Sequence, residues 1–303
     1  MRLQQNLTGN LYPGLKCVKH LISNSNRYKL TKQVNQYLQS DDCIIPDEEK
    51  PVIQKWFSMP LVHQISYPFI KKYLYRKVNI FFDNKKSLHY VLHSEKRLYF
   101  KKGMSKHDIR ELYNNLCIEQ DINSPHSYLA FPVHYQSTDI AVDIGAAEGI
   151  WALDIIEKVK EIYLFECEDA WIEALQATFE PWSDKIHIVN KFVSDVTDEV
   201  NTTLDDYFLG KNIVPDIIKA DIEGAEASCI KGASKLLTNH VRHFLLCTYH
   251  NYDDYRVLSE MMKSHGFETQ PSKGYMLTIY MEPNYSCKDA SKIVRKGLIH
   301  AYK

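Results

Sequence analysis

The sequence lacks several features that would assign a chain of 303 residues to a special class of protein. No apolar run approaches the roughly 20 residues of a membrane-spanning helix, so we expect no transmembrane segment. The first residues contain no apolar stretch of the kind found in a signal peptide, and we expect none. Lys and Arg number 37 against 38 Asp and Glu, and a net charge of −1 gives no general attraction to nucleic acids or anionic membranes.

The seven cysteines are dispersed and contain no C-x-x-C pair. An odd, scattered set favours reduced thiols over a disulfide framework or a zinc site, and we therefore expect a cytoplasmic protein. Hydrophobic residues make up 45% and charged residues 25% of the chain, which is typical of an ordinary globular protein. The sequence does not determine the oligomeric state.

From residue 139 onward, short β-branched runs alternate with segments of helical periodicity. This alternation predicts an α/β fold, with a largely parallel sheet that helices cover on both faces. Right-handed crossovers would then bring the carboxyl ends of the strands to one edge, where ligands bind. The expected strands are 139–144, 161–166, 186–190, 215–221 and 242–248, with closing strands in 267–281 and 294–302; the expected helices are 148–159, 169–179, 203–209, 225–237 and 252–264.

The first part of the chain has a different pattern. Residues 1–60 look mainly helical, with a helix that follows Asp47 and runs to about Trp56. Over 78–102, short runs in which apolar residues alternate with others are separated by polar turns, and this pattern predicts a β-meander. Ser105 is positioned to cap a helix that follows. We therefore expect an accessory α+β region at 1–120 and the main domain at 121–303.

Residues 139–149 contain a strand, a glycine turn and the start of a helix, as in nucleotide-binding α/β folds. Gly145 and Gly149 open the turn, and Glu166 ends the next strand, where a carboxylate accepts hydrogen bonds from ribose hydroxyls. The turn reads G-x-x-x-G and lacks the middle glycine that lets a backbone approach a pyrophosphate.

The charges expected around this turn also argue against a pyrophosphate ligand. Acidic residues that should share the ligand edge are Asp143, Glu148, Glu166, Asp221 and Glu223. They would repel a pyrophosphate and attract S-adenosylmethionine, which carries an ammonium and a sulfonium group. We therefore prefer S-adenosylmethionine to NAD, although an NAD-dependent oxidoreductase remains an alternative.

Two groups of motifs resemble known families. Val142–Gly149 and Phe165-Glu166 resemble the first two motifs of class I S-adenosylmethionine-dependent methyltransferases. More specifically, residues 125–303 resemble the FkbM family of methyltransferases, through Thr203–Tyr207, Ile217–Glu226 and Ile230–Ala233. Cys167 departs from the family pattern, which often has proline there.

This resemblance implies a Rossmann-like sheet of seven strands with a reversed last strand. It also implies O-methylation, commonly of sugar hydroxyls in glycans, glycolipids or natural products, so the expected partner is a small-molecule or glycan acceptor. The cofactor residues implied are Asp143, Gly145, Ala146, Gly149 and Glu166, with Ser194 and Asp195 near the adenine. We add their neighbours Glu148 and Cys167 to this set.

Methyl transfer to a hydroxyl also requires a group that accepts a proton. His250 is the first candidate for this base, and Asp221 or Glu223 is the second. Alternatively, these three residues hold Mg²⁺ or Mn²⁺, which would lower the pKa of the acceptor. We expect His126 or Tyr128, just before the first core strand, to contact the methionine part of the cofactor or the acceptor. A scaffold that binds the cofactor without catalysis is a third class of function.

Overall fold

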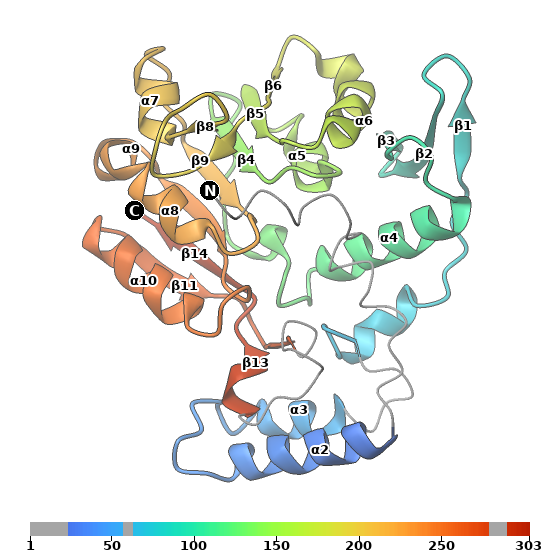
Figure 1. The fold of residues 1–303 in the computed structure, drawn as a ribbon, viewed down its shortest axis with the longest axis vertical. Coiled ribbons are helices and arrows are strands. Elements are labelled where there is room, and N and C mark those ends of the chain that lie inside the picture. The colour runs from blue at the N-terminus through green and yellow to red at the C-terminus, as the bar shows by residue number, and fades with distance from the viewer. Residues whose placement is uncertain (1–23, 57–62, 279–289) are drawn as a thin grey trace.

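The computed structural model describes residues 24–56, 63–278 and 290–303 (Figure 1). Its main feature is a seven-stranded sheet in the order β11-β14-β10-β9-β4-β5-β6. Five strands from the centre to one edge run parallel, and β14 is antiparallel to both of its neighbours. The strands are β4 (Ile140–Ile144), β5 (Glu161–Phe165), β6 (Ile186–Val189), β9 (Ile217–Ala220), β10 (His243–Cys247), β11 (Glu268–Pro271) and β14 (Leu298–Tyr302). The predicted seven-stranded α/β sheet with a reversed last strand is confirmed.

Both faces of this sheet are buried, because side chains alternate along each strand. In β5, Ile162 and Leu164 join one hydrophobic cluster, whereas Tyr163 and Phe165 join another on the opposite face. Helices complete the two clusters, as the alternation of apolar runs predicts. They are α5 (Ile150–Ile155), α6 (Asp169–Phe179), α7 (Leu204–Leu209), α8 (Glu226–Lys231), α9 (Ser234–Asn239) and α10 (Asp254–Ser264).

Some boundaries differ from those predicted. The single helix expected over 225–237 is divided into α8 and α9 at Gly232, where an added Cβ would lie 2.0 Å from the carbonyl oxygen of Ser194. The region expected as one strand over 267–281 contains β11 and the short β12 (Met276–Leu277), and residues 279–281 lie outside the described part. β12 pairs with β13 (Val294–Arg295). β7 (Phe192–Val193) and β8 (Asn201–Thr202) form a further small pair.

The predicted β-meander is present as β1 (Phe81–Asp83), β2 (Leu88–His93) and β3 (Lys96–Tyr99). It is followed by α4 (Lys106–Glu119), whose first turn is capped as expected: the Ser105 side chain accepts a hydrogen bond from the Asp108 backbone N–H at 3.1 Å. Earlier in the chain lie α2 (Asn24–Leu38) and α3 (Lys50–Trp56). The helical character expected for residues 1–23 lies outside the described part. Short 3₁₀ helices are η1 (Pro68–Lys72), η2 (Tyr128–Ala130), η3 (Glu180–Trp182) and η6 (Ala290–Lys292).

The meander and α4 pack against the main sheet. Leu98 and Leu112 belong to the same hydrophobic cluster as Trp151 of α5 and Trp171 of α6. The Tyr99 backbone N–H also donates to the Thr178 hydroxyl at 3.0 Å. This shared core brings α4 next to the ligand edge of the sheet (Figure 1). The domain boundary expected at residue 120 remains a prediction.

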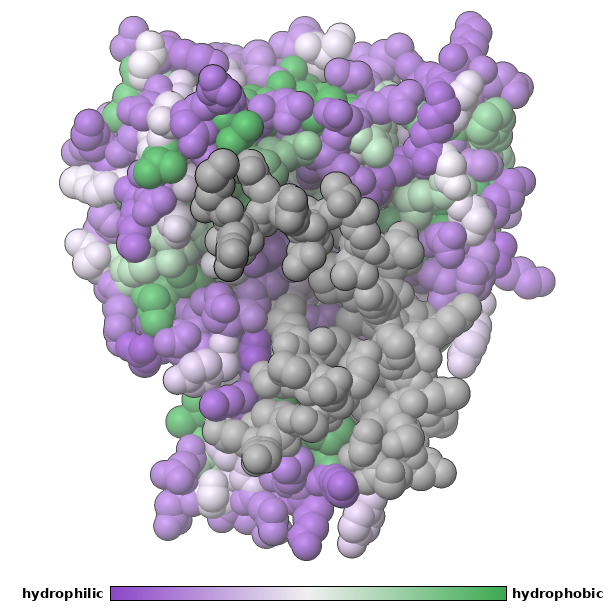
Figure 2. All heavy atoms as spheres, viewed as in Figure 1, coloured by the Kyte–Doolittle hydropathy of each residue, from purple (hydrophilic) through white to green (hydrophobic). Residues whose placement is uncertain are grey.

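The surface agrees with the balanced composition. Figure 2 shows hydrophilic side chains over most of the described surface on this face, with hydrophobic ones in small separate groups. None of the described helices combines the length and apolarity needed to cross a bilayer. The cysteines within the described residues are free thiols.

Candidate active site

A cavity of about 460 Å³ lies at the carboxyl ends of β4, β5 and β9. This is the edge at which parallel α/β sheets bind ligands, and the volume is typical of a small-molecule site. The turn after β4, Glu166 after β5 and Asp221 after β9 all contribute to its wall. Residues of α4 and of the segment before β4 line the remaining side.

The turn after β4 depends on glycine. Gly145 has a φ of +73°, and an added Cβ would lie 2.1 Å from the carbonyl oxygen of Asp221, so only glycine lets the two strand ends approach so closely. The backbone N–H groups of Gly145 and Ala146 both donate to Phe165, at 3.0 and 3.2 Å. Gly149 does not line the cavity. An added Cβ there would lie 2.7 Å from Leu175, so this glycine allows α5 to pack close to α6.

Glu166 holds the turn and the end of β5 together. One of its carboxylate oxygens accepts from the Ala147 N–H at 2.9 Å, and the other accepts from Cys167 and Glu168 at 2.7 and 2.8 Å. A carboxylate offers about four acceptor positions, so Glu166 can still accept hydrogen bonds from a ligand in the cavity that it lines. Cys167 also lines the cavity. Burial and the charge of Glu166 raise the pKa of its thiol to about 12, so it is not a thiolate at neutral pH.

Asp143 is neutralised by an ion pair with Lys219. Its carboxylate lies 2.7 Å from Lys219 Nζ, and both side chains are buried. Burial opposes the charge of Lys219, but Asp143 and Asp221 together raise its pKa and keep it protonated. The expectation that Asp143 contributes net negative charge to the cavity is therefore wrong.

Three other acidic residues on the cavity wall can carry negative charge when a cation is bound. Burial, followed by the charges of Asp221 and Glu148, raises the pKa of Glu119 to about 8. Burial also raises the pKa of Glu148 to about 7 and that of Glu223 above its usual range. These carboxyl groups all line the cavity, and a bound cation would stabilise their charged forms. Glu119 belongs to α4, and no sequence motif distinguishes it from other helical glutamates.

His126 and Tyr128 both line the cavity, as expected from their place before β4. The Tyr128 hydroxyl donates to Asp221 at 3.1 Å. The ring of His126 makes edge contacts with Tyr128 and Tyr249, and its Nε2 lies 3.5 Å from Asp221. Burial lowers the pKa of His126 to about 4, so the ring is neutral at physiological pH.

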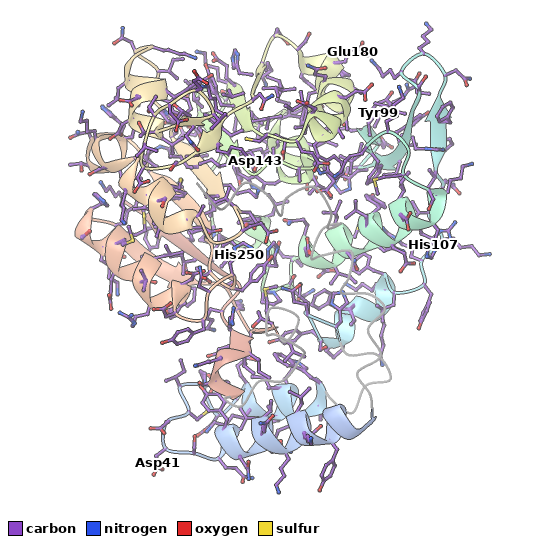
Figure 3. All side chains as sticks on the ribbon, in the orientation of Figure 1. Asp41, Tyr99, His107, Asp143, Glu180 and His250 are labelled. Atoms are coloured by element: carbon purple, nitrogen blue, oxygen red, sulfur yellow. The ribbon has the colours of Figure 1, made fainter. Side chains whose placement is uncertain are left out.

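His250 lies beside this cavity but is not part of its lining. Its Nδ1 is 2.9 Å from Glu226, and its Nε2 is 3.6 Å from Asp221 and 3.7 Å from Glu223. Burial opposes protonation, but the hydrogen bond to Glu226 and the nearby carboxylates raise the pKa of His250 to about 9. An imidazolium has no free lone pair to accept a proton, so the expected role of His250 as the base stays a prediction that requires the ring to lose this proton first. Figure 3 shows His250 and Asp143 in the same central part of the molecule.

The side chains around His250 include several types that can bind a metal ion. The group whose potential ligand atoms lie within 4.8 Å of one another contains Asp221, Glu226, Cys247 and His250, with Glu226 in place of the expected Glu223. A metal requires a deprotonated imidazole, whereas His250 is held as a cation between carboxylates. Binding of Mg²⁺ or Mn²⁺ by these residues would therefore have to displace that proton.

Ser194 and Asp195 are not in the wall of the cavity. The Ser194 hydroxyl donates to Asp195 at 3.2 Å, and the Ser194 carbonyl faces Gly232. Lys191, Phe192 and Val193, which precede them, line the cavity instead. Of the loop that contains Ser194 and Asp195, the part at β7 faces the cavity instead, and the adenine contact stays a prediction.

Comparison with known proteins agrees with the motifs. Residues 175–269 match the model of the methyltransferase FkbM domain. This segment begins within α6 and includes Asp221, Glu223 and His250, but not the turn at Gly145. No curated protein matches the chain significantly.

Several solved structures are similar to this one at low sequence identity. Methyltransferase FkbM from Methylobacillus flagellatus KT is 17% identical, with a TM-score of 0.47, and the match covers 66% of this chain and 56% of that protein. Precorrin-6y C5,15-methyltransferase from Geobacter metallireducens GS-15 is 14% identical, with a TM-score of 0.37 and coverage of 55% and 82%. TrmK from M. capricolum, solved with S-adenosylhomocysteine, is 14% identical, with a TM-score of 0.34 and coverage of 55% and 63%. The family match therefore assigns residues 175–269 of this chain to the methyltransferase FkbM domain.

Proposed function

We propose that this chain is an S-adenosylmethionine-dependent O-methyltransferase that acts on a hydroxyl of a sugar, glycan or related small molecule. The observation that carries the proposal is the set of three carboxyl groups, from Glu119, Glu148 and Glu223, that line a cavity at the ligand edge of the sheet. Burial and neighbouring carboxylates raise their pKa values, so a cation in the cavity would stabilise the charged form of each. A ligand with a sulfonium and an ammonium supplies that positive charge, whereas a pyrophosphate adds to the repulsion.

The residues around the cavity suggest how the methyl donor would be held. Glu166 would accept hydrogen bonds from the ribose hydroxyls, and the backbone of 145–147 would follow the methionine part. Asp143, paired with Lys219, would form the floor of that part of the site. Phe192 and Val193, instead of Ser194 and Asp195, would contact the adenine.

The chemistry that the donor supplies is an electrophilic methyl group on a positively charged sulfur. The chain must align an acceptor hydroxyl with that methyl group, exclude water and receive the hydroxyl proton. Asp221 has a pKa below its usual range: burial alone would raise it, but His126, His250 and Lys219 outweigh that effect. It is therefore a weak base, and its role would be to orient the acceptor and to stabilise positive charge.

Calorimetry with S-adenosylhomocysteine tests the cofactor assignment. We expect binding by the wild type and at least about tenfold weaker binding by Glu166→Gln, because one amide cannot replace a carboxylate that accepts three backbone hydrogen bonds. Glu161→Gln is the matched control, since Glu161 lies at the opposite end of the same strand. Binding of NAD, with no binding of S-adenosylhomocysteine, would refute the proposal.

The acceptor is tested separately, with donor that carries a labelled methyl group. We expect label to enter neutral sugars or glycan extracts, and not NAD-linked redox substrates. Binding of the donor without transfer to any hydroxyl acceptor would indicate a scaffold without catalysis, and would refute the enzymatic part of the proposal.

A further inference from the structure

Helix α4 presents one stripe of side chains to the cavity. Leu112, Leu116 and Glu119 all line it, and their spacing of four and three residues puts them on one face of the helix. α4 runs in Figure 3 from His107, on the outer side of the molecule, toward the central part that contains Asp143 and His250. The helix therefore delivers two apolar side chains and then a carboxyl group to the cavity.

Glu119 is an unusual residue for the end of a helix. It is the last residue of α4, where the helix dipole disfavours a negative charge. Among the described residues, no hydrogen bond or ion pair to its carboxyl group is found. Glu119 is half-buried and lines the cavity, so its carboxyl group is free to bind a ligand there.

A second observation on the same wall points to a ligand. His126 is only 3% exposed, lines the cavity, and neither of its ring nitrogens has a hydrogen-bond partner within the described part of the chain. A buried imidazole without a partner costs free energy unless a ligand supplies one. The ring is neutral, so it can both donate a hydrogen bond and accept one.

We propose that Glu119 binds the acceptor hydroxyl and takes its proton, with His126 orienting the same hydroxyl; this proposal rests on the proposed function. The acceptor oxygen forms a bond to the methyl carbon while the carbon–sulfur bond breaks and its electron pair stays on sulfur. The hydroxyl proton goes to the Glu119 carboxylate, which becomes a neutral carboxylic acid. The products are a methyl ether and a neutral thioether.

The surroundings of Glu119 suit this task. Its pKa is raised to about 8, which makes it a far stronger base near neutral pH than an ordinary glutamate. The charged groups that act on it come from three other parts of the chain: Asp221, Glu148 and Glu223 raise its pKa, and Lys219 lowers it. The ring of His126 on the same wall is neutral.

The same charges define the class of acceptor. Asp221 and Glu223 lie on the cavity wall with Glu119, so a phosphate, sulfate or carboxylate next to the reacting hydroxyl would be repelled. We therefore assign an uncharged hydroxyl group as the acceptor, with Leu112 and Leu116 beside its apolar face. Residues before 121 would then belong to the acceptor site.

Proton release on ligand binding tests the position of Glu119 without a known acceptor. Calorimetry in two buffers of different ionisation enthalpy measures the protons released when S-adenosylmethionine or S-adenosylhomocysteine binds near pH 7.5. Glu119 is mostly protonated at this pH, and a sulfonium that faces it would lower its pKa. We expect the wild type to release about 0.5 proton more with S-adenosylmethionine than with S-adenosylhomocysteine, which is an uncharged thioether.

Three variants make the result specific. Glu119→Gln should abolish the difference in proton release and change the affinity for S-adenosylhomocysteine by less than about twofold, which also shows that it folds. Glu111→Gln, on the same helix but outside the cavity lining, should behave as the wild type. Glu148→Gln should retain most of the difference in proton release between the two ligands.

Two outcomes would overturn this inference while leaving the proposed function intact. One is a difference in proton release that persists in Glu119→Gln, and the other is a difference that is lost only in Glu148→Gln. If the wild type bound neither ligand, the proposed function itself would fail, and the role of Glu119 would fail with it.

Discussion

Replacement of Gly145 by alanine would test the close approach of β4 and β9 on which the cavity depends. The residue has a φ of +73°, and an added Cβ would lie 2.1 Å from the carbonyl oxygen of Asp221. The backbone N–H of Asp221 in turn donates to Ile144 at 3.1 Å, so this oxygen cannot move without disturbing the strand pair. We expect Gly145→Ala to separate the two strand ends.

The cost has two parts. A left-handed φ costs alanine about 1–2 kcal/mol relative to glycine. A contact this short adds a further cost of about 1–3 kcal/mol, typical of overpacking in a region that cannot relax freely. Gly103→Ala separates the two terms, because Gly103 has a φ of +83° but no atom within 4 Å of an added Cβ. Gly103→Ala should lose only the stability that corresponds to the left-handed φ.

Urea denaturation measures the free energy of unfolding of both variants, and calorimetry measures their affinity for S-adenosylhomocysteine. Gly145→Ala should be less stable than Gly103→Ala by about 1–3 kcal/mol and should bind the ligand more weakly, while Gly103→Ala should bind it as the wild type does. Equal losses of stability in the two variants would refute the argument, since the predicted collision would then have no energetic consequence.

Three further predictions concern charged groups. Lys219→Met should lower the free energy of unfolding by about 3–5 kcal/mol, because it leaves Asp143 buried without its cation, and Asp143→Asn in the same chain should restore part of this loss in urea denaturation. The folded pKa of His250, about 9, is above its unfolded value near 6.5, so the stabilisation that His250 gains from Glu226 should be complete below pH 6.5 and disappear as the pH rises through 9. Urea denaturation between about pH 6 and pH 9.5 should show this decline in the wild type and a flatter profile in His250→Gln; parallel profiles would contradict it. With an acceptor that supports turnover, Glu119→Gln should lower kcat by about 10²–10⁴-fold with little change in donor affinity, and Glu119→Asp should recover part of the rate.

Much of the fold was predictable, because it follows from local patterns. Short apolar runs separated by helical periodicity predict strands that alternate with helices, and topological rules then bring their carboxyl ends to one edge. The turn at Gly145, the position of Glu166 and the cap at Ser105 are local features, and the structure contains all three. The sequence did not indicate that the helix expected over 225–237 is divided into α8 and α9, or that Gly232 packs against the distant carbonyl of Ser194.

The candidate site was predictable only in part. The sequence indicated that Asp143, Glu166, Asp221, Glu223 and His250 would share one edge. The four carboxylates line one cavity, whereas His250 lies beside it. It indicated nothing about protonation, because the pKa of His250 depends on three carboxylates that only the folded chain brings within 4 Å of it. For the same reason, the sequence did not indicate that neighbouring carboxylates raise the pKa of His250, the expected base.

The sequence by itself determined the order of strands and helices and the motifs at the strand ends, since both are set by residues close together in the chain. Only the tertiary structure decided which charges neutralise one another, as in the pairing of Asp143 with Lys219. It also decided which distant segments reach the cavity. Glu119 belongs to a helix with no recognisable motif, and it becomes a candidate because the packing of α4 against the sheet brings it to the cavity that Asp221 also lines.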